Sequence, residues 1–167
     1  MKKSVLNVIV ALTAVFSVSV VNAQSTPEFL YNTCIENGKV VSKQVCRLDP
    51  SGNVHKLHLK YEYSYNVKGV IQSCKTLHWN KRTASWENTS IKTFEYNNLQ
   101  KTVTIYYALW NKKENVFDEP QQKAVYQYFD EEHLVNYTQY RKDILNNDWQ
   151  INTYFDKNNY LISQINE

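Results

Sequence analysis

Polar and apolar residues alternate most regularly between residues 57 and 65. The odd positions in this stretch are all Leu or Tyr, and the even positions are His, Lys, Glu and Ser. Because successive side chains of a strand point to opposite faces, the pattern predicts a strand with one buried and one solvated face. Asn66 to Gly69 follow, with Asn at the first position and Gly at the last, which predicts a tight turn closed by a left-handed residue.

Weaker copies of this strand and turn recur toward the C-terminus. In each copy an aromatic pattern ends in Asn or Asp, at Asn66, Asn97, Asp130 and Asp156, so the copies lie 31, 33 and 26 residues apart. Each unit is about one hairpin long, a period typical of repeat architectures.

The opposite bends carry a second signature, a pair of aromatic residues that flank the loop. The pairs are Trp79 and Trp86, Trp110 and Phe117, and Tyr140 and Trp149. We expect the two rings of each pair to face each other across a hairpin, where such a pair adds about 0.2–1 kcal/mol.

These patterns predict an all-β fold, an antiparallel meander of repeated hairpins with about eight to ten strands. The short connections allow antiparallel neighbours and exclude parallel crossovers. From Leu99 onward bulky residues occupy both faces: Val103, Ile105, Tyr107 and Leu109 on one, Tyr106, Ala108 and Trp110 on the other. The sheet can close into a barrel, fold into two layers, or stay elongated and curled, and the pattern leaves these three forms open.

Composition supports this interpretation, with 13 Tyr, 6 Phe and 4 Trp but only 3 Gly. Aromatic residues favour strands, and scarce Gly means that Asn and Asp must occupy most turns. Asn37-Gly38 lies between two strand-like runs and predicts a first hairpin.

The first 23 residues have the pattern of a cleaved secretory signal peptide. A basic start, Met1-Lys2-Lys3, precedes an apolar run from Val5 to Val21 and the small-residue end Val21-Asn22-Ala23. We expect a single domain over residues 24–167, exported to the periplasm, the cell surface or the medium, without integral membrane insertion after cleavage. Without Lys2 and Lys3 this domain has 17 basic and 16 acidic residues, a net charge of +1, and shows no basic patch for nucleic acid.

Three cysteines leave the disulfide state open. An exported compartment permits disulfides, and Cys34 and Cys46 lie on either side of the Asn37-Gly38 turn, so they can form a bridged hairpin if the register brings them together. Cys74 is then expected to be a small buried apolar residue.

The leader, the Tyr-x-Tyr-Asn hairpin at residues 63–66 and the Trp-Asn-Lys loops at 79–81 and 110–112 together resemble small secreted proteins of unknown function from Bacteroidetes. The resemblance covers residues 24–167 and implies an all-β exported domain, with no catalytic residue or ligand to carry over. The turns are also distantly similar to the tyrosine-aspartate repeats of large bacterial surface and toxin proteins.

No motif in the sequence indicates a catalytic centre or a cofactor. His55 and His58 are three apart, which places them on opposite faces of a strand, and we expect no metal site. The acidic runs Asp118-Glu119 and 130–132 lie in predicted turns. Carboxylates can hydrolyse glycans when two of them face each other across a groove, so a secreted glycan hydrolase is the enzymatic alternative.

The aromatic excess is the feature with a functional implication. Exposed Trp and Tyr rings suit sugar rings and protein partners, so Trp79, Trp86, Trp110 and Trp149 are the candidate ligand-binding residues. We expect a non-catalytic binding or surface-interaction module for an unknown protein or glycan. A structural protein that associates with itself through sheet edges is the third hypothesis, and the oligomeric state is open.

Overall fold

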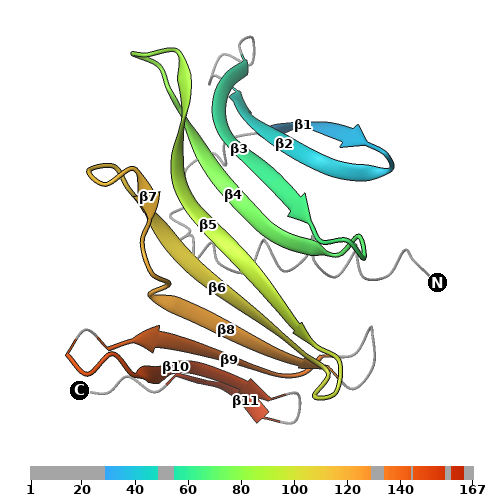
Figure 1. Cartoon of the computed structure of the whole chain (residues 1–167), viewed down its shortest axis with the longest axis vertical. Coiled ribbons are helices and arrows are strands. Elements are labelled where there is room, and N and C mark those ends of the chain that lie inside the picture. Colours follow the sequence, from blue (N-terminus) through green and yellow to red (C-terminus); the bar gives the residue numbers. More distant parts are fainter. Residues whose placement is uncertain (1–28, 49–54, 129–133, 144, 157–158, 164–167) are drawn as a thin grey trace.

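The computed structural model describes residues 29–48, 55–128, 134–143, 145–156 and 159–163, and these residues form eleven strands (Figure 1). In chain order they are β1 (Phe29–Glu36), β2 (Lys39–Leu48), β3 (His55–Tyr65), β4 (Ile71–Asn80), β5 (Ser85–Asn97), β6 (Thr102–Asn111), β7 (Val116–Phe117), β8 (Gln122–Tyr128), β9 (Leu134–Lys142), β10 (Trp149–Asp156) and β11 (Asn159–Ser163). The predicted signal peptide lies outside the described residues. Within the described part of the chain, no helix is long and apolar enough to cross a bilayer.

The strands form one antiparallel meander in the order β1-β2-β3-β4-β5-β6-β8-β9-β10-β11, and the short β7 pairs with β6 beside this path. The predicted fold is therefore confirmed. Of the three forms left open, the described strands adopt an open sheet that does not close into a barrel. Figure 1 shows long, curved strands in a twisted sheet, with β1 and β2 at one end and β10 and β11 at the other, as the right-handed twist of each strand leads one to expect.

The largest cluster of buried residues lies on one face of this sheet, here called the tyrosine face, while Leu77 and Ala108 are buried on the opposite face. Its buried cluster packs against partly buried tyrosines, which include the odd positions of the alternating stretch, Tyr61, Tyr63 and Tyr65. At its centre Ile105 and Ala124 are directly opposite each other and are 1% and 0% exposed. The buried cluster comprises Ile71, Cys74, Phe94, Ile105, Ala124, Tyr126 and Tyr137.

Two tyrosines of this face also fasten neighbouring strands together. The Tyr65 hydroxyl donates to the carbonyl oxygen of Val40 at 2.8 Å, and the Tyr96 hydroxyl donates to that of Ile71 at 3.0 Å. In both bonds the donor lies 25 residues after the acceptor, so the hairpin repeat reproduces the contact. Each bond adds about 1 kcal/mol net to stability.

The Asn-Gly and Asn-x-x-Gly turns form as predicted. Asn37 and Gly38 have φ values of 50° and 73°, the pair of positive angles that a two-residue type I′ hairpin needs. At the next turn the Asn66 side-chain oxygen accepts the N–H groups of Lys68 and Val70, both at 3.0 Å. Gly69 closes that turn with φ 78°.

The hairpin turns at the opposite end of the sheet repeat one motif three times, and the motif starts at Asn80, Asn111 and Asp143. The first side-chain oxygen accepts N–H groups two or three positions ahead, as in Asn111 with Lys113 at 3.1 Å and Glu114 at 3.2 Å. The residue four positions ahead is left-handed, at Ala84, Asn115 and Asn147. The residue seven positions ahead bonds the first side chain, in the pairs Asn80–Glu87, Asn111–Asp118 and Asp143–Gln150.

The register of the first hairpin settles the cysteine question. Leu30 is opposite Cys46, whereas Cys34 is opposite Ser42. The two cysteines are thus four strand positions out of register, about 13 Å along the strand, too far for a disulfide. All three thiols are free, and Cys74 is buried as the sequence predicts.

The tyrosine face makes stability sensitive to alkaline pH. Burial raises the pKa of Tyr96, Tyr128 and Tyr137 to about 12, whereas an unfolded tyrosine has a pKa of about 10. The unfolded chain therefore loses these protons first, and stability present at neutral pH falls as the pH rises from about 10 through about 12. Urea unfolding at pH 8 to 12 should show a falling midpoint, with a shallower fall for Tyr96→Phe. A midpoint that stays constant to pH 12 would contradict this.

The three turns predict a stabilising substitution at Ala84, which has φ 49° where the other two turns have Asn. A left-handed backbone costs most residues about 1 kcal/mol and costs Asn less. Ala84→Asn should therefore raise the free energy of unfolding by about 0.5–1 kcal/mol. The matched reverse change, Asn115→Ala, should lower it by about as much, and equal urea midpoints for both variants and the natural protein would disprove the explanation.

Candidate functional site

All four tryptophans lie on the face of the sheet opposite the tyrosine face. Lys75, Ile91 and Ala108 are directly opposite one another across β4, β5 and β6. Trp79 lies four positions beyond Lys75, and Trp110 lies two beyond Ala108, so both share the face of these three residues. The same reasoning places Trp149 there, through Tyr106, Lys123 and Tyr140 on β6, β8 and β9 and through Lys142 opposite Trp149.

This surface is here called the tryptophan face, and its aromatic residues are Trp79, Trp86, Trp110, Trp149, Phe117, Tyr106 and Tyr140. Each of these side chains is half-buried. The face therefore keeps ring surface in contact with solvent, although the core cluster of the molecule is on the other side.

Two of the three predicted aromatic pairs form across their hairpins. Trp79 is opposite Trp86 in the register, and their ring centroids are 5.1 Å apart at an interplanar angle of 65°. Trp110 is opposite Phe117, with centroids 4.8 Å apart at 69°. Such edge-to-face packing directs the positive edge of one ring at the negative face of the other, so each ring holds its partner in a fixed orientation.

The third predicted pair is wrong. The residue opposite Trp149 is Lys142, while Tyr140 is opposite Ile151. The turn motif of this hairpin begins at Asp143. Lys142 therefore occupies the position immediately before the motif, where the other two hairpins have Trp79 and Trp110. Lys142 instead forms an ion pair with Glu119 at 2.9 Å.

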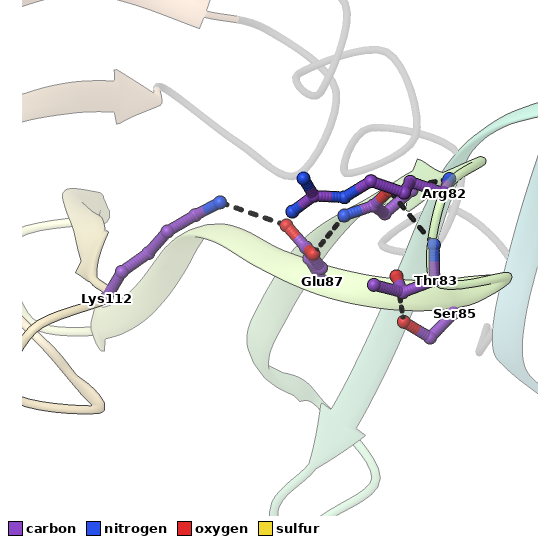
Figure 2. Close-up of polar contacts among 6 residues, drawn as sticks. Arg82, Thr83, Ser85, Glu87 and Lys112 are labelled. Carbon is purple, nitrogen blue, oxygen red and sulfur yellow. Dashed lines mark hydrogen bonds and ion pairs between the residues drawn. The ribbon is translucent and has the colours of Figure 1, made fainter.

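A polar clip joins the tips of the first two aromatic hairpins. Glu87 accepts a hydrogen bond from Asn80 of its own hairpin and pairs with Lys112 of the next at 2.9 Å. Figure 2 shows Lys112 reaching toward Glu87 and the Arg82 side chain extending beside the same carboxylate. The hydrogen bond from Asn80 is the largest cause that lowers the pKa of Glu87, and the hydrogen bond from Lys112 is the second. The charged Glu87 carboxylate therefore connects the two turns.

In the third hairpin, formed by β9 and β10, the aromatic rings pack around Lys123 of β8. Its ammonium lies 4.8 Å from the centre of the Tyr140 ring and 4.6 Å from that of Trp149. Tyr106 packs against Trp149 at 6.4 Å and donates its hydroxyl to Glu95 at 3.1 Å. A cation over two rings is attracted by their negative faces, so Lys123 holds both rings in place.

Burial lowers the pKa of Lys123, and the nearby Glu95 partly opposes this. Next to this group is a small hollow of about 100 Å³ with a mainly amide and cationic lining. It is lined by Gln122, Lys123, Gln139, Tyr140, Arg141 and Asn152.

Three of the described glutamates, Glu62, Glu87 and Glu119, form ion pairs with lysines. Lysine partners help to lower the pKa of three glutamates, Glu62, Glu87 and Glu119. A glycosidase needs the opposite for its general acid, a carboxyl group with a raised pKa. These three carboxylates are therefore suited to tying strands and turns together.

Histidine chemistry is equally limited in this part of the chain. His58 stacks on Phe29 and meets His78 edge-on, each at 6.0 Å between ring centroids. Burial, then the neighbouring His78 and Arg47, lowers the pKa of His58. The described residues include no group of three or more potential metal-ligating side chains.

The four tryptophans that the sequence suggested as candidates share one face, whereas the contacts of Lys123 and the shared turn motif were not predicted. The turn motif could have been recognised from its spacing, because its first residue is followed seven positions later by the polar residue that it bonds, as in Asn80–Glu87 and Asn111–Asp118. No local pattern pointed to Lys123, because its two rings come from β9 and β10.

Comparison with known proteins supports the fold. The chain is similar to a protein of unknown function from Bacteroides fragilis, with a TM-score of 0.68 and 22% identity over 81% of this chain and 96% of the other. It is also similar to DUF3836 family proteins from Parabacteroides distasonis and Bacteroides vulgatus. Both have a TM-score of 0.53 and 26% identity, over 56% and 58% of this chain and 84% and 96% of theirs. No curated protein matches the sequence.

The model of the family of unknown function DUF3836 matches residues 1–128, well over half of the 167 residues. The suspected resemblance to Bacteroidetes proteins of unknown function is thereby confirmed, and the chain belongs to the DUF3836 family.

Proposed function

We propose that this protein is an exported, non-catalytic binding or surface-interaction module that contacts its ligand through the tryptophan face. The observation that carries the proposal is the separation of aromatic residues between the two faces. The apolar cluster of the tyrosine face already provides most of the core, yet all four tryptophans lie on the other side and are only partly buried there. Partly exposed aromatic groups of this kind mark interaction sites in soluble proteins.

The chemistry of the face suits a ligand with flat apolar surfaces bordered by hydrogen-bonding groups. The indole rings are held edge-to-face or by Lys123, so little side-chain entropy is lost when a ligand binds. The amide and cationic lining near Lys123 offers donors and acceptors close to the Trp149 ring. A glycan has this combination of an apolar ring face and a polar rim, and a protein partner is the second candidate.

The electrostatics favour binding over hydrolysis. Lysine ion pairs keep Glu87 and Glu119 charged, whereas the alternative of a secreted glycan hydrolase requires one protonated acid. Export is inferred from the signal-peptide pattern of the first 23 residues.

Substitution of the rings tests the proposal. The chain expressed from Met1 should be screened against a glycan array and against surface proteins, and the best ligand measured by calorimetry. Trp149→Ala and Trp110→Ala should each weaken binding at least about tenfold, because truncating an aromatic hot-spot residue at the centre of an interface costs about 2 kcal/mol or more.

Leu109→Ala is the matched control, since Leu109 is 50% exposed and lies on the tyrosine face, opposite Ser90. It should bind like the natural protein. Equal affinity of the tryptophan variants would contradict the proposal, and release of new reducing ends from a bound glycan would favour the hydrolase.

A further inference from the structure

The edge strand β1 exposes its whole length. All eight residues from Phe29 to Glu36 are exposed, and the large apolar side chains Phe29, Leu30, Tyr31 and Ile35 are 38%, 46%, 59% and 62% exposed. β1 pairs with β2 on one side, and no described strand pairs with its outer side.

Soluble proteins usually protect such an edge. Short strands, lysines, prolines and bulges prevent the free N–H and C=O groups from pairing with another chain. β1 contains neither Lys nor Pro, and Glu36 is its one charged residue. The irregularity after Cys34 adds its extra residue, Val41, to β2, so β1 itself stays regular.

We propose that β1 pairs with β1 of a second copy of this chain, antiparallel and around a two-fold axis at Asn32. A two-fold axis requires one residue to lie opposite itself, because hydrogen-bonded and non-hydrogen-bonded pairs alternate along an antiparallel ladder. With Asn32 at the axis, Phe29 is opposite Ile35 of the second copy, and Leu30 is opposite Cys34.

This register matches apolar residues with apolar residues, and Tyr31 then meets Thr33. An axis at Thr33 instead places Leu30 opposite Glu36, and an axis at Cys34 leaves Phe29, Leu30 and Tyr31 unpaired. The axis at Asn32 therefore covers the exposed apolar side chains best.

Pairing of β1 with β1 of a second copy fits this edge better than a head-to-tail array, in which β1 would pair with β11 of the next copy. The other edge strand, β11, has five residues against eight in β1. Pairing β1 with β11 would leave part of β1 open and would build an unending chain of copies, whereas β1 with β1 closes as a dimer. The joined sheet would keep both tryptophan faces on one side and make binding bivalent, and this consequence alone rests on the proposed function.

Light scattering on the chain expressed from Met1 tests the pairing without a ligand. The natural protein should have twice the chain mass at micromolar concentration. Leu30→Lys with Ile35→Lys should shift it to a monomer and raise the dimer dissociation constant at least tenfold, because lysines on an edge strand oppose its pairing with another chain. Val67→Lys with Leu99→Lys is the matched control, because both residues are almost fully exposed in other turns, and it should stay dimeric.

A cross-link tests the register. Asn32→Cys in a Cys34→Ser background should form a disulfide between copies under mild oxidation, while the natural Cys34, four positions from its equivalent, should not. A monomer at every concentration, a series of larger polymers, or cross-linking through Cys34 would each overturn the proposal.

Discussion

The whole structure depends on the two-residue alternation of strands in one continuous register. Ten strands follow one another across the sheet with antiparallel partners, so each side chain's face is fixed by its neighbours. A slip of one residue would exchange the faces of an entire strand. The position of all four tryptophans on the face opposite the main buried cluster is therefore a property of the register as a whole.

Two sets of turns maintain that register with little help from Gly. At one end, Asn37-Gly38 and Asn66 to Gly69 use glycine for their left-handed positions. At the other, an Asn or Asp side chain caps the loop and binds a partner seven residues later. Because the aromatic pairs Trp79–Trp86 and Trp110–Phe117 lie directly beside these loops, the same short segments define both the hairpin and the orientation of the candidate site.

Local signals were sufficient for the strands, the antiparallel order and the packing of Tyr61, Tyr63 and Tyr65 against the buried cluster. They were insufficient wherever the answer depended on a long-range register. Cys34 and Cys46 flank one turn but are four positions out of register, and Tyr140 looked like the partner of Trp149 although the loop begins at Asp143. The Lys123 group could not be predicted, since it joins residues of β6, β8, β9 and β10.

The central claim is that the tryptophans and the main buried cluster occupy opposite faces. Nuclear magnetic resonance of the aromatic and methyl groups in the presence of a soluble gadolinium chelate measures this directly, because the chelate broadens the signals of solvent-exposed groups most. Signals of all four indoles should broaden, while those of Tyr126 and Ile105, which are 3% and 1% exposed, should stay sharp. Indole signals as well protected as that of Tyr126 would contradict the account.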